Sequence, residues 1–220
     1  LISPILANVY LHYVLDLWFE KCIKKQLYGE AYLVRFADDF LIMFQYERDA
    51  QRVYEAIIKR MELFGLELSK EKTRILPFGR NCATRETFDF LGFTHFNSKT
   101  RKGYYTVGHK ISRKKKKQFK SNLKKWVKEN RNTQFDEFMK ALNKKLTGSF
   151  NYYSLSGMIR EVRSLWIHSL YVTFKWLNRR SQRRSFKLER FYEIWNDRII
   201  HPYIHVDIWS GDIVIYNKSV

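Results

Sequence analysis

Two neighbouring carboxylates, Asp38 and Asp39, are the residues of this sequence whose type and spacing best suit metal chemistry. They lie between two short apolar runs, residues 32–36 and 40–44, whose β-branched and aromatic composition predicts paired strands with the aspartates at the turn. Two like charges at an apolar-walled turn repel each other, and a divalent cation removes that conflict. Mg²⁺ prefers carboxylate and phosphate oxygens, so the turn is a candidate site for it. The alternative is an ordinary turn, where Asp is common because its side chain bonds the nearby backbone.

The charge balance indicates a polyanionic partner. The chain has 220 residues, with 41 Lys and Arg against 22 Asp and Glu, and its formal net charge of +19 exceeds what solubility requires. A membrane surface is the competing polyanion, but no apolar run approaches the length of a spanning helix, so nucleic acid is favoured. The composition, 45% hydrophobic with only 9 Gly and 3 Pro, supports a packed core in one large or two small domains.

Two helices are expected to flank the predicted hairpin and position its turn. Ser3 is expected to cap a long first helix with Pro4 at its first position, and Gly29 is expected just after its end. After the hairpin, apolar residues at helical spacing predict a second helix that is closed by Gly65: Ala50, Val53, Tyr54, Ile57, Met61 and Phe64.

Short strands are expected to follow the second helix. Residues 66–69 and 73–76 are typical of brief strands, and residues 88–93 and 104–107 predict a hairpin joined by a polar loop. Helix, hairpin, helix and strands in this order predict an antiparallel sheet with helices on one face. The expected fold of residues 1–108 is therefore α+β.

The composition changes near Gly108, where a basic helical region begins. Residues 110–128 contain ten Lys or Arg and no acid, yet keep one apolar face, and two further apolar stripes predict an all-α domain over residues 109–195. A second basic cluster follows the third helix, and its members are Arg179, Arg180, Arg183, Arg184 and Lys187. The alternative for both clusters is a solvated face or a localisation signal. Residues 196–220 form a tail without an interpretable motif.

Cysteine and histidine usage gives no metal-binding pattern. Cys22 and Cys82 are too few and too far apart for a disulfide framework or a zinc knuckle, so a reducing, cytoplasmic or organellar compartment is expected. His201 and His205 are separated by Pro202 and are interpreted as structural. The sequence has no signal peptide and no initiator Met, and we interpret it as a fragment of a longer protein.

Five blocks, in order, resemble group II intron-encoded reverse transcriptases. Four of them resemble successive parts of a reverse transcriptase palm: residues 1–8 (LISPILAN) with 10–12 (YLH), 36–39 (FADD), 65–73 (GLELSKEKT) and 90–93 (FLGF). Residues 146–153 (LTGSFNYY), together with the basic run at 179–184, resemble the thumb, or maturase, domain of this family. The resemblance spans roughly residues 1–190 and implies a partial palm followed by an all-α thumb/maturase domain.

The resemblance implies an RNA-directed DNA polymerase in which Asp38 and Asp39 hold two Mg²⁺ ions, replaceable by Mn²⁺, for nucleotidyl transfer. Nucleotide and primer contacts are implied for Phe36, Ala37, Lys72, Leu91 and Gly92, and template-side contacts for Ser3, Pro4 and Asn8. The residues implied to follow RNA phosphates are Lys114, Lys115, Lys116, Lys117, Lys120, Lys124 and the four arginines of the second cluster. The implied partners are an RNA template, intron RNA, a DNA primer or target, and dNTPs, with no membrane.

Simpler roles stay open for several of these residues, and the function has two alternatives. Lys72 could be a solvated lysine, Leu91 and Gly92 an ordinary turn, and Ser3 and Pro4 only a helix start. The family also needs a fingers region and a further upstream carboxylate, for which Asp16, expected far from the turn, is no substitute, so the chain alone is expected to be inactive. The alternative functions are a non-catalytic maturase-like RNA-binding splicing factor and a reverse transcriptase of a CRISPR-linked or other defence system.

Overall fold

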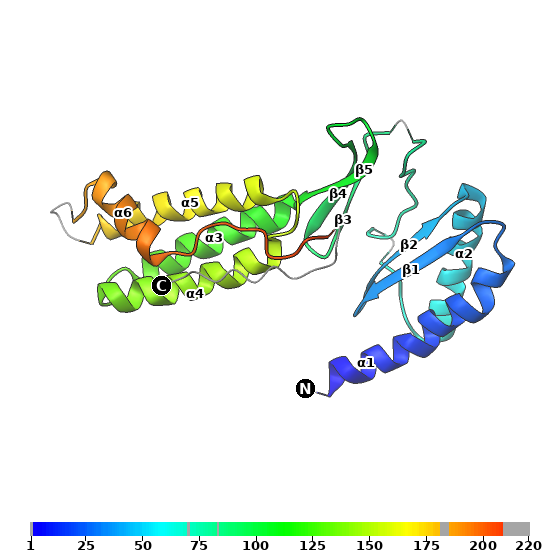
Figure 1. Cartoon of the computed structure of the whole chain (residues 1–220). Helices are drawn as coiled ribbons and strands as arrows, with labels where there is room; N and C mark the ends of the chain where they lie inside the picture. Colours follow the sequence, from blue (N-terminus) through cyan, green and yellow to red (C-terminus); the bar gives the residue numbers. More distant parts are fainter. Residues whose placement is uncertain (1, 70, 83, 181–184, 209–220) are drawn as a thin grey trace. The chain divides into compact units, whose positions relative to one another are not determined.

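The computed structural model describes residues 2–69, 71–82, 84–180 and 185–208, which form two compact units. The first unit comprises Leu1–Leu91 with Asn97–Thr106, and the helical unit comprises Gly92–Phe96 with Val107–Val220. Antiparallel strands with helices come first along the chain and a helical region follows, as Figure 1 shows, so the α+β prediction is confirmed.

The chain begins with one continuous helical segment whose winding changes along its length. α1 (Ser3–Leu11) runs into a π-helical turn at His12–Asp16, a second at Phe19–Ile23, and a 3₁₀ turn at Lys24–Gln26. A π-helical turn carries one residue more than an α-helical turn, and such turns are frequent at functional sites. The prediction of one regular helix therefore misses the wide turns.

Both predicted ends of this helix are wrong. Ser3 is the first helical residue and not the cap, since Ile2 occupies that position in helical conformation without a side-chain cap bond. Gly29 is not the residue that ends the helix, because the chain already leaves it at Leu27, in extended conformation. The backbone N–H groups of Tyr28 and Gly29 instead donate to the buried carboxylate of Asp49, both at 3.0 Å.

The predicted hairpin is present, and helices cover one of its faces. β1 (Ala31–Phe36) and β2 (Asp39–Phe44) pair antiparallel, and α2 (Glu47–Leu63) follows. Gly65, which was predicted to close this helix, lies just past its end in the left-handed region, at φ 67°. The side chains at Ala31, Leu33, Phe40, Ile42 and Phe44 face a core formed with Val14, Leu15, Phe19, Val53, Ile57 and Met61 of the helices. Burying these apolar side chains holds the hairpin against both helical segments.

The segment after α2 does not form the two short strands predicted for it. Among its described residues, 66–69 and 73–76 have no ladder partner, and the backbone turns back on itself, with Lys72 and Thr73 both donating from their N–H groups to the Ser69 carbonyl. Strand propensity without a neighbouring edge to pair with does not produce a strand.

A three-stranded sheet follows, in the order β3-β4-β5. β3 (Thr87–Phe90) and β4 (Phe93–Lys99) are joined by a two-residue turn at Leu91-Gly92, and β5 (Tyr105–Ile111) follows. The single strand predicted for residues 88–93 is therefore two strands around a tight turn. Leu91 and Gly92 both have positive φ, 49° and 81°, which suits the primed turns of hairpins.

Four helices make up most of the helical unit: α3 (Arg113–Asn130), α4 (Phe135–Tyr153), α5 (Ile159–Leu177) and α6 (Leu188–Arg198). Their shared core contains fully enclosed large side chains, among them Phe138, Leu142, Leu165, Phe191 and Trp195. Part of the tail joins this unit, since Val206 bridges to Leu155 and the His205 N–H donates to the Ser154 carbonyl. No helix in the described part of the chain is long and apolar enough to cross a membrane.

Candidate active site

The two aspartates lie at the tip of the β1–β2 hairpin. Phe36 and Asp39 are the last paired residues, so Ala37 and Asp38 are the two central residues of the turn. Ala37 has φ 53°, a conformation that costs a residue with a Cβ and that the first central residue of a two-residue hairpin turn adopts. Asp38 and Asp39 are both exposed, so their carboxylates are open to solvent and to ligands.

The strand alternation places Asp39 at the end of an exposed apolar surface. Phe36, Val34 and Tyr32 alternate with the core-facing residues of β1, and Phe36, the cross-strand partner of Asp39, is 64% exposed. Successive side chains of a strand point to opposite faces, so this surface is the side of the hairpin opposite the helices. The carboxylate site therefore adjoins a surface on which the flat face of a base or sugar could pack.

The two carboxylates at the turn fit a Mg²⁺ ion whose remaining ligands are phosphate oxygens of a substrate and water. The described residues contain no group of three or more His, Cys, Asp or Glu that could hold a metal ion, so the turn offers two carboxylates only. Mg²⁺ is commonly held by one or two carboxylates plus phosphate oxygens and water, which this pair can provide. Water screens the repulsion between the exposed aspartates, so the fit to Mg²⁺ rests on their adjacency and not on an apolar wall.

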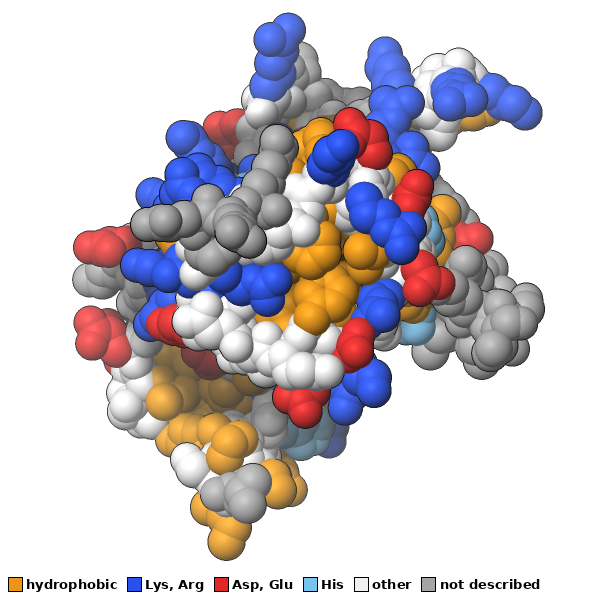
Figure 2. All heavy atoms as spheres, turned by 90° about the vertical axis from the view of Figure 1, so that its left-hand side faces the viewer, with side chains coloured by type: hydrophobic (Ala, Val, Ile, Leu, Met, Phe, Trp, Pro, Cys, Tyr) orange, Lys and Arg blue, Asp and Glu red, His pale blue; other side chains and the backbone are white. Residues whose placement is uncertain are grey.

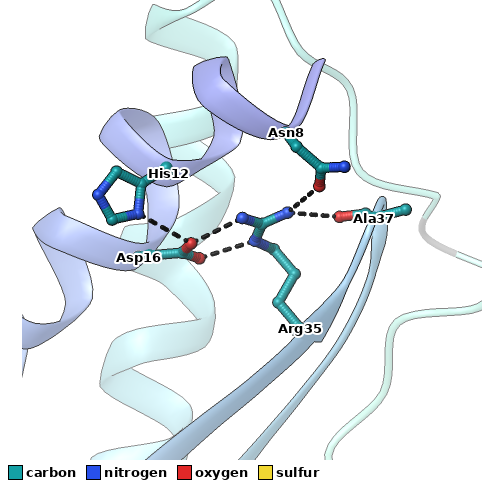
Figure 3. Close-up of polar contacts among 5 residues, drawn as sticks. All are labelled: Asn8, His12, Asp16, Arg35 and Ala37. Atoms are coloured by element: carbon teal, nitrogen blue, oxygen red, sulfur yellow. Dashed lines mark hydrogen bonds and ion pairs between the residues drawn. The ribbon is translucent and has the colours of Figure 1, made fainter. Parts of the chain in front are cut away.

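One arginine connects the hairpin tip to the N-terminal helical segment (Figure 3). The Arg35 guanidinium donates from Nε and Nη2 to the two oxygens of Asp16, each at 2.7 Å. Its Nη1 donates to the Asn8 side-chain oxygen at 2.9 Å and to the Ala37 carbonyl at 2.8 Å. The forked geometry of guanidinium and carboxylate is among the stronger hydrogen-bonded arrangements in proteins. Arg35 thereby fixes the first residue of the aspartate turn to a helix.

The electrostatics of this contact favour the charged state of Asp16. The hydrogen bonds from Arg35 hold the pKa of Asp16 below its usual value, more than burial raises it, and His12, 3.3 Å away, adds to the effect. The side chains of Arg35 and Asp16 are only 12% and 26% exposed, so water screens the ion pair incompletely. The expectation that Asp16 lies far from the turn is wrong: one guanidinium separates its carboxylate from the Ala37 carbonyl.

The sequence reading missed this contact, although a signal for it was present. The period-two alternation of β1 places Arg35 on the same face as Ala31 and Leu33, which is the core face. A charged side chain on a core face requires an acidic partner. Asp16, with its neighbour His12 one turn away, supplies that partner from the π-helical turn.

The remaining predicted residues of the first unit separate into those that join the hairpin and those that do not. Asn8 joins it through Arg35, whereas Ser3 and Pro4 are exposed on α1. Lys72 is exposed in the turn after Ser69, and no hydrogen bond or ion pair within the described residues links its side chain to the aspartates.

The predicted primer-contact turn meets the start of α3. The Gly92 carbonyl accepts from the N–H of Ser112, which caps α3, and a Cβ at Gly92 would lie 3.5 Å from Cγ of Lys115. Leu91, at φ 49°, is strained in the same way as Ala37. A predicted primer contact, Gly92, and a predicted phosphate contact, Lys115, are thus neighbours within the helical unit.

The basic cluster on α3 divides into two faces. Lys116 forms an ion pair with Glu161 of α5 at 3.1 Å, and Lys120 lies close enough to His168 of α5 to lower the pKa of that histidine, after the larger effect of burial. These two lysines therefore face α5. The other four predicted phosphate contacts on α3 have exposed side chains that are open to a phosphate backbone: Lys114, Lys115, Lys117 and Lys124.

The second basic cluster is described only in part. Arg179 is exposed, and Arg180 is half-buried with its Nε donating to the Leu177 carbonyl at 3.2 Å. Arg183 and Arg184 lie outside the described residues.

Both cysteines, Cys22 and Cys82, are free thiols.

Comparison with known proteins bears on the hairpin and its surroundings. A search of curated proteins finds no match to this chain. A comparison with protein families finds a match, and the matched segment contains the residues that build the aspartate turn and the Arg35 contact. Residues 1–95 match the family described as reverse transcriptase (RNA-dependent DNA polymerase), which supports RNA-directed DNA polymerase activity in general, with an RNA template, a DNA primer and dNTPs.

Proposed function

We infer that this chain is the palm and thumb part of an RNA-directed DNA polymerase of the group II intron type, which also binds intron RNA and assists its splicing. The observation that carries the proposal is the pair of exposed aspartates at a tight hairpin tip within the segment that matches reverse transcriptases. The lysine-rich helix α3 adds support for the RNA-binding part, because exposed lysines contact phosphates without reading sequence.

Asp38 and Asp39 would hold two Mg²⁺ ions, which supply activation of a primer 3′-hydroxyl and stabilisation of the departing pyrophosphate. The chain's own residues perform the positioning. Arg35 fixes the Ala37 carbonyl and hence the start of the aspartate turn, and Phe36 offers an apolar face beside Asp39. Preorganised groups of this kind lower the barrier because they need no rearrangement during the reaction.

Primer extension on an RNA template tests the proposal. The assay uses the longest natural protein that contains this chain, with Mg²⁺ and dNTPs, and compares Asp38→Asn and Asp39→Asn with Glu55→Gln, an exposed acid of α2. Losing several kcal/mol of metal-dependent stabilisation lowers the extension rate about 100-fold or more. RNA binding is expected to persist in both Asp variants, and Glu55→Gln is expected to extend normally.

The outcome separates the enzyme from its alternatives. Extension that survives Asp38→Asn refutes the assignment of the catalytic site. A protein that binds intron RNA and promotes splicing, but extends no primer in its unmodified form, would instead be a non-catalytic maturase. An intron enzyme and a defence-associated reverse transcriptase share the same chemistry, and genomic neighbours distinguish them.

A further inference from the structure

Three cationic side chains lie close to one tryptophan of the helical unit. The face of the molecule that Figure 2 shows has apolar side chains lying among Lys and Arg. Trp176 is in the last turn of α5 and is half-buried. Arg131 lies 5.4 Å, Arg179 5.6 Å and Lys128 5.8 Å from its ring centre. We call these four residues the Trp176 cluster. Its cations come from the end of α3, the turn after α3 and the turn after α5, so the fold brings them together.

The cations of the Trp176 cluster have no acidic partner within the described residues, unlike other cations of the same unit. Arg190 pairs with Glu193 and Arg198 with Asp136, whereas no ion pair joins Lys128, Arg131 or Arg179 to a carboxylate. Helix C-termini and aromatic rings both attract cations, and this attraction accounts for one cation near the end of α3 and one near the end of α5. Three positive charges within 6 Å of one ring centre still repel one another, and a bound anion relieves that repulsion.

The cluster also continues a stripe of exposed lysines along α3. Lys114, Lys117, Lys124 and Lys128 are separated by three, seven and four residues, spacings that place side chains on one face of a helix, and all four are exposed. At 1.5 Å per residue, Lys114 and Lys128 lie roughly 20 Å apart along the axis. Lys116 and Lys120 belong to the other face, toward α5. These four exposed lysines therefore form a line along α3 that ends at the Trp176 cluster.

We propose that the Trp176 cluster is a phosphate-binding site for the RNA backbone, at the far end of the α3 lysine stripe. The ring holds three unpaired cations close together, and the cations bind the phosphates of a strand that follows the stripe. The proposal rests on the proposed function only for the choice of RNA as the polyanion, and it requires no catalysis.

RNA binding measured by fluorescence anisotropy over a series of KCl concentrations tests the site, with the full chain and no dNTPs present. The double variant Arg131→Gln/Arg179→Gln is compared with Lys59→Gln/Arg101→Gln, which removes the same charge from exposed positions of the first unit. Loss of two phosphate contacts reduces the slope of log affinity against log salt by about 1.5, and the affinity at low salt by about tenfold or more. The control pair is expected to change the affinity by less than about threefold, as for charges that act only at long range.

A third variant, Trp176→Leu, keeps every charge and removes the ring that holds the cations. It is expected to weaken RNA binding by several-fold, and Trp176→Phe, which retains an aromatic face, is expected to restore most of the affinity. Circular dichroism of each variant checks that the helices remain.

Equal losses in the double variant and its charge-matched control overturn the proposal, because binding would then reflect net charge alone. Loss of duplex DNA binding with unchanged RNA binding also overturns it, since the partner would be DNA. Failure of primer extension leaves these binding results unchanged, so the two proposals succeed or fail separately.

Discussion

Replacing Arg35 by Met is expected to destabilise the hairpin that carries the aspartates. The substitution keeps an unbranched apolar stem that reaches about as far as the Arg Nε, but it removes the guanidinium and its four hydrogen bonds: two to Asp16, one to Asn8 and one to the Ala37 carbonyl. It also leaves the partly enclosed carboxylate of Asp16 without its main partner. The Arg35→Lys variant keeps the charge but cannot reproduce the fork, so it is expected to recover less than half of the loss.

The size of the effect follows from the burial of the pair. Exposed ion pairs contribute about 0–1 kcal/mol, and removing one partner of a buried pair costs about 3–5 kcal/mol. Arg35 is 12% and Asp16 26% exposed, which places this contact between the two limits. We expect the free energy of unfolding to fall by about 2–3 kcal/mol.

Hydrogen exchange of peptides covering residues 31–44 measures this loss of stability in the hairpin itself.

The contribution of Asp16 to the free energy of unfolding depends on pH, because its folded-state pKa lies below its usual value of 3.8. Stability from a carboxylate with a lowered pKa is present above the unfolded-state pKa and is lost as the pH falls through the folded-state value. The difference between the unmodified protein and Arg35→Met is therefore expected to be constant from about pH 5 to 7 and to shrink below about pH 4.

A double-mutant cycle with Asp16→Asn decides whether the two residues act together. If they do, the double variant Arg35→Met/Asp16→Asn loses less stability than the two single variants added. A loss below about 1 kcal/mol for Arg35→Met, with additive effects in the cycle, would refute the reasoning because it would match a surface ion pair.

Two further substitutions test the contacts that hold the hairpin to α2. Gly29→Ala would place a Cβ 2.6 Å from the Tyr46 ring. The resulting overpacking is expected to lower the free energy of unfolding, measured in urea, by about 1–3 kcal/mol. An unchanged midpoint of the urea unfolding curve would show that the ring moves aside freely. Asp49→Ala would leave the partly buried N–H groups of Tyr28 and Gly29 without their acceptor and is expected to cost about 2–4 kcal/mol. Hydrogen exchange at those two amides is expected to become faster, and unchanged exchange there would contradict the assignment.

The local patterns of the sequence predicted the elements whose apolar residues recur at a regular helix or strand period. Apolar spacing located α2 and the three long helices of the helical unit, and the two apolar runs around Asp38 and Asp39 located the β1–β2 hairpin. These features follow from the 3.6- and 2-residue periods of helix and strand, which any buried face must obey. The α+β class followed from their order.

Pairing partners, by contrast, were decided by the tertiary structure. Residues 66–69 and 73–76 have strand-like composition but no strand to pair with, and the single run at 88–93 divides at Leu91-Gly92 into two strands. Composition reports how well a residue suits a strand, not whether a neighbouring edge is available.

The same distinction applies to the site. The sequence by itself singled out Asp38 and Asp39 as candidate metal ligands by their adjacency, and it showed the basic character of α3. Only the tertiary structure showed that Arg35 connects the aspartate turn to Asp16, and that Lys116 faces Glu161 while Lys114 faces outward. The physical reason is that adjacency and charge are written along the chain, whereas an ion pair depends on which side chains the packed core brings within a few ångströms of each other.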